Sequence, residues 1–363
     1  MTTKLVILTQ IMAPYRIPVF NRLADDPELD VIVLFAAERE PHRLWPTYEA
    51  EMSFEYEVLP EHFTFRQSTS WTHLSRGLGR RLRRSRADVV VAGGWDQITH
   101  LWAYVLRRPL GYRFVWWVES TERDVRPASL WREKLKRWVV SHADAVLVPG
   151  VASQRYVHSL GAGDIVVAPN AVDNERFMSG SGRTRSEEFE FIFVGRLQDE
   201  KGIPDLLQAW SMVRSRTVRL RIVGDGPLRD QVVTYARKDE RVQVSGHMNR
   251  EELVSAYHSA DALVLPSRSE PWGLVINEAM ASGLPVIASS VAGAVDDLVR
   301  EGHNGLIVPP NNPRALAAAL SELAGDPDRA LEMGSRSLEM IRKYSPEACA
   351  RGFRELASKL NRK

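Results

Sequence analysis

Two glutamates eight positions apart, Glu270 and Glu278, have the surroundings of a ligand site. The apolar run Asp261–Ser267 predicts a buried strand that ends in a Pro/Ser break. Leu274–Ser282 has a helical pattern, which Gly283 ends. Glu270 is therefore expected in a strand-to-helix loop, and Glu278 on the helix that follows, about 12 Å further along its axis.

This placement favours the binding of one extended polar ligand. Open α/β sheets bind ligands at the carboxyl ends of their strands. There the two carboxylates could accept hydrogen bonds from two parts of the ligand, while the helix N-terminus offers backbone N–H groups to an anion. The spacing alone does not establish a site, because acidic residues are common on exposed helix surfaces.

The surrounding blocks resemble the motifs of one enzyme family, the retaining glycosyltransferases of family GT4, which have the GT-B fold. The two glutamates resemble its E-x7-E motif, and Gly195, Arg196 and Lys201 lie in a stretch that resembles its donor-phosphate segment. The N-terminal half contributes mainly Pro14–Phe20, which resembles a segment of one GT4 subgroup. The blocks of the C-terminal half follow in the family's order: Pro169–Asp173, Phe191–Gly202, Ile222–Pro227, Gly283–Val286 and Gly302–Pro309.

The resemblance implies that the donor substrate is a nucleoside-diphosphate sugar. Arg196 and Lys201 would hold its diphosphate, where fixed cations stabilise the charge that builds on the leaving phosphate. Gly195 would let the backbone approach the ligand closely. The alternative for each cation is an exposed surface charge, and the alternative for Gly195 is a glycine that only ends a strand.

The same resemblance assigns the two acids. Glu278 would accept hydrogen bonds from the ribose hydroxyls. Glu270 would hold hydroxyls of the transferred sugar, beside the N–H groups of Gly273 and Leu274. Trp272 is expected either to contact the sugar or to be a core aromatic. The catalytic set implied by the family is Arg196, Lys201 and Glu270.

Two residues of the N-terminal half are candidates for substrate contacts. Arg16 follows the first strand and is expected to meet the donor phosphate or an acceptor charge, unless it is only a cation at a helix start. Glu119 follows the strand Phe114–Val118, where many relatives carry a histidine that reaches the donor sugar. Because an ionised carboxylate accepts but does not donate, we expect Glu119 to recognise hydroxyl or amino groups of donor or acceptor. The alternative is that Glu119 lies in a solvent-facing loop.

No residues with the spacing of a metal site stand out, and no cofactor is expected. The nine histidines lack ligand spacing. Asp326-Pro327-Asp328 formally matches the Asp-x-Asp of metal-dependent glycosyltransferases, but an aspartate before a proline between two helices predicts an N-cap. Arg196, Lys201 and a helix N-terminus would then have to offset the charge of the diphosphate.

Length and composition predict a globular protein of two domains. The chain has 363 residues, of which 44% are hydrophobic and 26% charged, and its net charge of +2 gives no reason to expect nucleic-acid binding. No apolar run approaches about 18 residues, and Leu5–Leu8 predicts a first strand rather than a signal peptide. The single Cys349 excludes internal disulfides and is typical of a reducing cytosol, so we expect a cytoplasmic location.

Short apolar runs alternate with amphipathic stretches in both halves, which predicts an α/β fold with two parallel sheets. We expect two Rossmann-like domains facing across a cleft, which is the GT-B architecture. The expected acceptor domain is 1–170, with a C-terminal helix in 345–363 crossing back to it as in the family. A linker at 171–188 and a nucleotide-sugar donor domain at 189–344 complete the chain. Residues 41–71 break the alternation, which is typical of a functional or mobile segment.

Basic residues gather in two places of the N-terminal half. One is an arginine cluster between residues 76 and 86, and the other is the helical pattern Trp131–Trp138, which also carries tryptophans. Such faces can lie on anionic lipid, here at the inner face of the cell membrane, and a solvated helix face is the alternative. The acceptor is expected to be a glycan, a lipid-linked glycoside or a small-molecule glycoside.

Three other functions stay open as alternatives. A sugar-nucleotide epimerase of the GT-B fold would consume donor without an acceptor. A non-catalytic sugar-nucleotide-binding subunit is disfavoured by the intact set of Arg196, Lys201, Glu270 and Glu278. A nucleotide-dependent dehydrogenase is disfavoured because no G-x-G-x-x-G follows Leu5–Leu8. The donor sugar, its base, the acceptor and the oligomeric state are not specified by the sequence.

Overall fold

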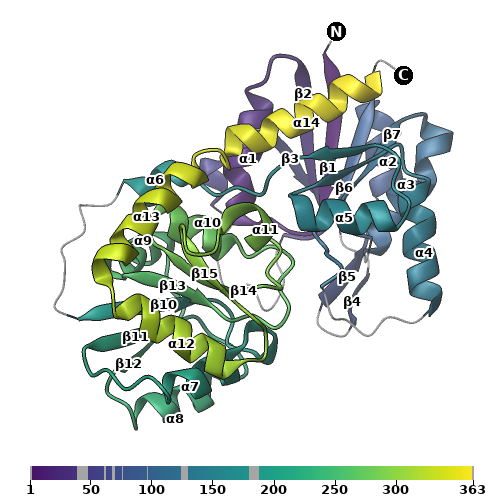
Figure 1. Ribbon diagram of the computed structural model, residues 1–363. Coiled ribbons are helices and arrows are strands. Elements are labelled where there is room, and N and C mark those ends of the chain that lie inside the picture. The colour runs from purple at the N-terminus through teal and green to yellow at the C-terminus, as the bar shows by residue number, and fades with distance from the viewer. Residues whose placement is uncertain are drawn as a thin grey trace. The chain divides into compact units, whose positions relative to one another are not determined.

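Two compact units, each built around one parallel sheet, make up the chain (Figure 1). The computed structural model describes residues 2–38, 48–60, 63–67, 70–75, 77–95, 97–123, 130–179 and 188–361. Unit 1 comprises Met1–Thr121, Arg126–Ala171 and Pro346–Lys363, and unit 2 comprises Glu122–Val125 and Val172–Ser345. The predicted α/β class with two Rossmann-like domains is confirmed.

In the described part of unit 1, seven parallel strands form one sheet in the order β3-β2-β1-β6-β7-β8-β9. Its strands are β1 (Thr3–Thr9), β2 (Leu29–Phe35), β3 (Glu55–Val58), β6 (Val89–Gly93), β7 (Arg113–Trp117), β8 (Ala145–Val148) and β9 (Ile165–Val167). The central strands are continuous apolar runs because helices cover both faces. One face carries α1 (Ile17–Ala24) and α14 (Pro346–Asn361). The other carries α2 (Leu78–Ser85), α3 (Ile98–Leu110), α4 (Leu130–Ser141) and α5 (Val151–Ser159).

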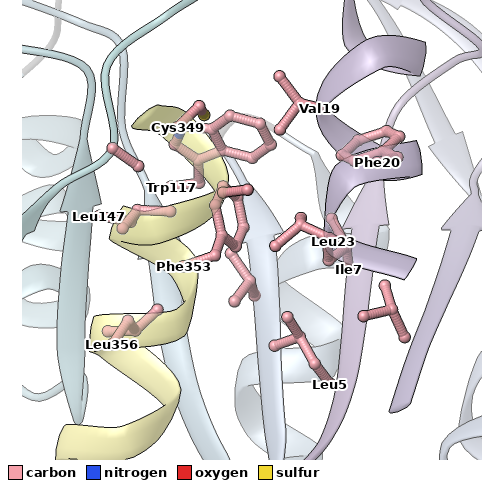
Figure 2. Packing of buried hydrophobic residues seen from close by; sticks show 14 of the residues in the cluster. Leu5, Ile7, Val19, Phe20, Leu23, Trp117, Leu147, Cys349, Phe353 and Leu356 are labelled. Carbon is pink, nitrogen blue, oxygen red and sulfur yellow. The ribbon is translucent and has the colours of Figure 1, made fainter. Parts of the chain in front are cut away.

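The last helix, α14, packs on α1 and on the strands β1, β8 and β9 of unit 1 (Figure 1). It places Cys349, Phe353 and Leu356 among the buried side chains of β1, β7 and α1 (Figure 2). The ring of Phe353 meets Trp117 edge to face, with centroids 5.0 Å apart. Burial on this scale makes the C-terminal segment a part of the core of unit 1.

In the described part of unit 2, six parallel strands form the sheet, in the order β12-β11-β10-β13-β14-β15. Its strands are β10 (Phe189–Val194), β11 (Val218–Val223), β12 (Val242–Ser245), β13 (Ala262–Leu265), β14 (Val286–Ser289) and β15 (Gly305–Val308). On one face lie α7 (Ile203–Trp210), α8 (Arg229–Ala236) and α12 (Pro313–Ala324). On the other lie α6 (Asn174–Met178), α9 (Arg250–Ser259), α10 (Leu274–Ala281) and α11 (Val295–Leu298), and α13 (Pro327–Ile341) contributes to both cores.

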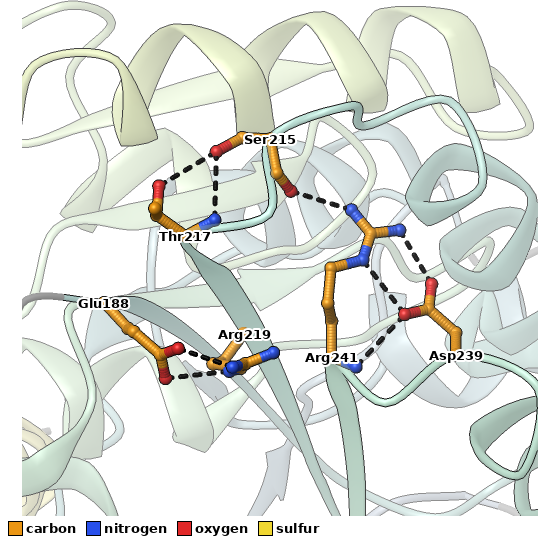
Figure 3. Close-up of polar contacts among 6 residues, drawn as sticks. All are labelled: Glu188, Ser215, Thr217, Arg219, Asp239 and Arg241. Carbon is orange, nitrogen blue, oxygen red and sulfur yellow. Dashed lines mark hydrogen bonds and ion pairs between the residues drawn. The ribbon is translucent and has the colours of Figure 1, made fainter.

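Arginine–carboxylate pairs fasten the amino ends of the outer strands of this sheet (Figure 3). Arg241, just before β12, donates to both oxygens of Asp239 and to the carbonyl of Ser215 before β11. The hydrogen bonds from Arg241 lower the pKa of the Asp239 carboxyl. Arg219 on β11 pairs with Glu188, just before β10. Because these pairs lie at the amino ends, they brace the sheet without reaching its carboxyl edge.

The predicted linker 171–188 contains a short helix, α6. Its N-cap is Asp173, and Asn174 donates a hydrogen bond to the carbonyl of Ile341, which holds the helix on unit 2. The polar residues from 180 to 187, where the Gly/Ser content predicted a surface linker, lie outside the described residues. The range predicted as a linker therefore also contains a capped helix that packs the apolar side chains of Phe177 and Met178 against unit 2.

The stretch 41–71 is more regular than predicted. Glu55–Val58 is the edge strand β3, and β4 (Phe63–Gln67) pairs with β5 (Ser70–Leu74) in an antiparallel hairpin. Residues 41–47 lie outside the described residues. The stretch is therefore not irregular throughout, and its functional or mobile role stays a prediction. The strand β3 escaped the sequence pattern because, as an edge strand, it lacks the apolar run of the central strands.

None of the described helices is long and apolar enough to cross a membrane.

The packing of α14 predicts a sharp difference between two glycine substitutions. A Cβ at Gly352 would lie 2.5 Å from the carbonyl oxygen of Val167, whereas a Cβ at Gly163 would meet nothing within 4 Å. Gly352→Ala should therefore lower the free energy of unfolding of unit 1 by about 1–3 kcal/mol, the usual cost of overpacking, and Gly163→Ala should leave it nearly unchanged. Urea unfolding followed by tryptophan fluorescence measures this, since all tryptophans except Trp210 and Trp272 precede residue 140. Equal stability of the two variants would show that α14 does not pack as described.

Candidate functional site

The candidate site lies at the carboxyl edge of the sheet of unit 2, where the loops after β10, β11 and β13 meet. Gly202 makes the contact between the loops after β10 and β13, because a Cβ there would lie 2.1 Å from the carbonyl oxygen of Pro266. Its φ of 72° is also left-handed, which glycine adopts without strain. Gly224 makes the contact between the loops after β10 and β11, since a Cβ there would lie 2.0 Å from the carbonyl oxygen of Gly195.

Polar contacts lock the loops after β10 and β13 together. The carbonyl oxygen of Glu200 accepts the N–H groups of Arg268 at 2.8 Å and Ser269 at 3.2 Å. Arg268 also forms a bidentate pair with Asp205 on α7, at 2.7 and 2.9 Å. Lys201 lies between Glu200 and Gly202, so these contacts determine where its side chain starts relative to the loop after β13.

Lys201 and Glu270, the two residues predicted from the sequence to serve phosphate and sugar, form an ion pair with each other. The same carboxylate oxygen, Oε2, accepts a hydrogen bond from Ser267 Oγ at 3.4 Å. Glu270 is only 7% exposed, and its carbonyl accepts the N–H of Gly293 at 3.0 Å. A carboxylate this buried needs partners to remain charged, and Lys201 and Ser267 provide them.

Groups with positive charge and without a described partner lie on the same sheet edge as this pair, in the loop after β10 and at the start of α10. Arg196 is exposed, and its guanidinium forms no hydrogen bond or ion pair with any residue that the structure describes. The N–H groups of Leu274 and Val275, which begin α10, have no partner within the helix, and the N-cap Gly273 has no side chain to cap them. A Cβ at Gly273 would lie 3.2 Å from Cγ of Glu270, so this turn places the helix start beside the carboxylate. Together these groups suit an anion.

Glu278 lies in the second half of α10, in a less polar environment than Glu270. Its Oε2 accepts a hydrogen bond of 2.8 Å from the hydroxyl of Tyr257, a fully buried residue of α9. Burial raises the pKa of Glu278 to about 7, against the opposing effects of the Tyr257 hydrogen bond and the Arg250 charge. Burial and the Glu278 charge also raise the pKa of Tyr257 well above its usual value, so Tyr257 stays a donor. Glu278 can therefore change its charge near neutral pH.

Trp272 is a core residue, and the structure does not support its predicted contact with the sugar. The side chain is 4% exposed and packs in the apolar core beneath α10. Its indole N–H donates to Oδ1 of Asn277 at 2.9 Å. Because its polar atom already has a partner and its rings are covered, the burial of Trp272 favours the core-aromatic alternative.

In unit 1, the two candidate residues Arg16 and Glu119 pair with each other. Arg16 follows the turn at the end of β1, and Glu119 follows β7, so both lie at the carboxyl edge of that sheet. Asn170 donates to Oε1 of Glu119 and accepts from Arg16, both at 3.0 Å, and the guanidinium lies over the ring of Trp117 at 3.9 Å. The charge of Arg16 is thus already matched within unit 1, which weakens its predicted contact with a substrate charge.

Glu119 follows β7 in a stretch without helix or strand, and its side chain is 37% exposed, so the alternative of a solvent-facing loop stays open. Its carbonyl accepts a hydrogen bond of 3.0 Å from Ser153 Oγ, and its Oε1 takes the bonds from Arg16 and Asn170. The other oxygen, Oε2, accepts no hydrogen bond from the described residues. That oxygen is what Glu119 retains for a substrate hydroxyl or amino group, so its recognition role stays a prediction.

Several residues that build these sites were not predicted. They are Ser267, Arg268, Asp205, Tyr257 and Asn170. Asn170 lies in the Pro169–Asp173 block, and Ser267 in the Pro/Ser break after β13. Their place in these segments could have suggested a role near the site, but not which residue each one contacts. The pairing of Asp205 with Arg268 and the hydrogen bond from Tyr257 to Glu278 left no signal, since a single sequence does not reveal partners 63 or 21 positions away.

The described residues contain no group of three or more His, Cys, Asp or Glu side chains placed to hold a metal ion. In the Asp-x-Asp segment, Asp326 is the N-cap of α13 and accepts the N–H of Arg329 at 3.0 Å. The helix-cap interpretation of this segment is confirmed.

Two family models match the chain, and they divide it as the two units do. Glycosyltransferase Family 4 matches residues 25–176, and Glycosyl transferases group 1 matches residues 174–340. The second match contains Arg196, Lys201, Glu270 and Glu278.

Curated relatives match over part of the chain. The glycogen synthase of Mycobacterium tuberculosis is 33% identical over an alignment of 202 positions, which covers 53% of this chain and 48% of that protein. The D-inositol 3-phosphate glycosyltransferase of Kineococcus radiotolerans is 32% identical over an alignment of 256 positions, which covers 60% of this chain and 58% of that protein. The chain spans about half the length of the curated relatives it matches.

The fold is also that of solved glycosyltransferase structures. Anabaena HepE in complex with UDP and glucose superposes with a TM-score of 0.77, covering 98% of this chain and 99% of that one at 18% identity. At this identity the likeness shows the fold, and the family models carry the assignment. The chain belongs to the GT-B glycosyltransferases of family 4, with a C-terminal unit of the glycosyl transferases group 1 type.

Proposed function

We propose that the protein is a retaining glycosyltransferase that moves a sugar from a nucleoside-diphosphate sugar to an acceptor hydroxyl. The observation that carries this proposal is the pairing of Lys201 with the buried Glu270, at the sheet edge that also holds Arg196 and the start of α10. This arrangement offers positive charge and a hydroxyl-binding carboxylate within one edge of unit 2. The HepE structure, which contains UDP and glucose, supports a ligand of the same kind here.

Lys201, Arg196 and the first N–H groups of α10 would hold the diphosphate. A diphosphate oxygen competes with Glu270 for Lys201, so binding would leave Lys201 shared between a phosphate oxygen and the carboxylate. Glu270 could then accept hydrogen bonds from the sugar hydroxyls with its other oxygen, Oε1. Arg196 has no ion pair with a described residue to break when phosphate binds, so its contact with the phosphate costs less than that of Lys201.

Glu278 would accept hydrogen bonds from the ribose hydroxyls. Its carboxylate form is the stronger acceptor, and a donating hydroxyl pair would favour that form over the protonated one. The hydroxyl of Tyr257 would hold the carboxylate in place from the other side.

In the proposed reaction, the bond between the sugar C1 and the donor phosphate oxygen breaks as a bond from C1 to the acceptor oxygen forms on the same face. The leaving phosphate takes the proton of the acceptor hydroxyl, so no separate general base is needed. Cations fixed at the diphosphate lower the barrier because negative charge builds there in the transition state. The names of the relatives favour a carbohydrate or polyol acceptor, free, in a glycan or linked to lipid, and we place the activity in the cytoplasm.

The unpaired arginine gives the clearest test of the phosphate site. Arg196→Ala should lower kcat by roughly 10²–10³, the usual cost of removing one charge-stabilising donor, without changing the Tm, because no described residue depends on it. Lys201→Ala should lower kcat as much and also reduce stability, since it leaves Glu270 without its cation. Lys238→Ala, an exposed cation of the same unit, is the matched control. Wild-type kinetics for Arg196→Ala would remove this assignment.

The raised pKa of Glu278 predicts a pH-dependent affinity for the donor. Below about pH 7 the folded protein holds Glu278 protonated, and above it Glu278 is a carboxylate. The affinity for UDP-glucose should therefore rise several-fold between pH 6 and pH 8, because only the carboxylate is a strong acceptor for the ribose hydroxyls. Calorimetric titration checks this, and Glu278→Gln should abolish the rise. A slope that persists in Glu278→Gln would assign the titration to another group.

The reaction itself should be retaining and should persist in EDTA. The family motifs predict that product and donor share anomeric configuration, and Arg196, Lys201 and the helix start supply the positive charge that the diphosphate needs. NMR of the first product gives its anomeric configuration, with the activity measured before and after chelation. An inverted anomer would contradict the proposed mechanism, and loss of activity in EDTA that added Mg²⁺ restores would contradict the proposed role of the cations.

A further inference from the structure

The outer side of α3 exposes apolar side chains instead of polar ones. Ile98, Trp102, Val105 and Pro109 are all exposed, with Trp102 at 48% and Val105 at 56%. Their spacing places them on one face of the helix, opposite the face that packs on the sheet. Helix α3 contains no acidic residue. A surface helix of a soluble domain normally carries charged residues on this face, so the stripe indicates a binding surface.

Helix α4 extends the stripe. Trp138 is 51% exposed and meets the ring of Tyr104 on α3 edge to face, with centroids 5.7 Å apart, so the two helices lie side by side. Leu135, one turn before Trp138, is exposed as well. Half of the exposed large apolar side chains in the described part of the chain lie on these two helices. The side chain of Trp131, part of the tryptophan pattern in the sequence, lies outside the described residues.

Cations border the stripe on both sides. Helix α2 packs next to α3, since a Cβ at Gly79 would lie 3.4 Å from the side chain of Leu106. On α2 and at its end four arginines are exposed: Arg80, Arg83, Arg84 and Arg86. On α4, Lys134 and Arg137 are exposed. Arg76, the first member of the arginine cluster in the sequence, lies outside the described residues.

The end of the stripe is also basic. Arg107, Arg108, Arg113 and His142 line a hollow of about 370 Å³ together with Asp144. Asp144 is paired with Arg113 at 2.9 Å, and Glu133 on α4 is paired with Lys136 at 2.7 Å. The acidic residues of this surface are therefore matched, and its excess charge is positive.

We propose that the face formed by α2, α3 and α4 docks on a membrane rich in anionic lipid. The stripe of α3 and α4 enters the interface between headgroups and acyl chains, where tryptophan is favoured, and the arginines bind lipid phosphates. A second copy of the chain fits this face less well, because a two-fold contact would bring the same arginines together. The positive charge around the stripe therefore favours an anionic bilayer over a second copy of the chain.

Vesicle binding tests this surface without any glycosyl transfer, so the result is independent of the proposed function. The protein should co-sediment with vesicles of phosphatidylcholine and phosphatidylglycerol but not with phosphatidylcholine alone, and high salt should release it. Arg83→Glu/Arg84→Glu should weaken binding at least about tenfold, since each cation near the surface contributes on the order of 1 kcal/mol. Trp102→Ser/Trp138→Ser should weaken binding at least about tenfold as well, because it removes two rings from the interface. All variants should bind UDP-glucose as the wild type does.

Matched controls lie on unit 2. Leu331 is 53% exposed, like Val105, and Arg214 and Arg216 are exposed arginines. Leu331→Ser and Arg214→Glu/Arg216→Glu should bind the vesicles as the wild type does. Three results would overturn the proposal: no binding to anionic vesicles, equal losses in the controls, or a concentration-dependent dimer in sedimentation experiments that Trp102→Ser/Trp138→Ser abolishes without vesicle binding in the wild type.

Discussion

The contact of Gly202 with the carbonyl oxygen of Pro266 is the constraint on which the candidate donor site depends. β10 and β13 are neighbours in the sheet, so their following loops start side by side. Only a residue without Cβ lets the first loop pass so close to the second, because a Cβ would lie 2.1 Å from that oxygen. The hydrogen bonds from Arg268 and Ser269 to Glu200 then hold the crossing in place. Backbone packing therefore determines where the side chain of Lys201 starts, and from there it reaches Glu270.

The charges at this crossing suit a ligand that is both anionic and rich in hydroxyl groups. Lys201 and Glu270 neutralise each other, whereas Arg196 and the start of α10 remain positive. The corresponding edge of unit 1 is different. There Arg16, Glu119 and Asn170 satisfy one another, so that edge holds a closed polar cluster with one carboxylate oxygen left over. The asymmetry between the two edges is the physical reason to place the donor on unit 2.

The sequence predicts elements well wherever burial on both faces leaves a continuous apolar run or a helical stripe. The strand predicted at Phe114–Val118 is β7, at Arg113–Trp117, and the helix predicted at Leu274–Ser282 is α10, at Leu274–Ala281. Two elements were not predicted. They are β3, an edge strand that pairs with β2 alone, and α6, a short helix inside the range predicted as a linker. In both cases tertiary contacts, not local pattern, make the element.

The candidate site divides in the same way. Motif spacing placed Arg196, Lys201, Glu270 and Glu278 at one sheet edge, because strand ends and helix starts follow from local pattern. It could not reveal that Lys201 pairs with Glu270, 69 positions away, or Arg16 with Glu119, 103 positions away. Such pairs depend on how loops cross in space. Trp272 was open between two roles for the same reason, since only the folded chain shows whether a ring is covered.

The central claim is that Lys201 serves the diphosphate and Glu270 the sugar of one ligand, although the two are paired with each other. The ratio of the Kd values for UDP and UDP-glucose, measured by calorimetry for the wild type and Glu270→Gln, tests it most directly. If the claim is right, Glu270→Gln weakens UDP-glucose at least about tenfold, the loss of a charged hydrogen bond or two, and leaves UDP unchanged or tighter because Lys201 is released. Equal changes for UDP and UDP-glucose would contradict it, since Glu270 would then not distinguish the sugar from the phosphates.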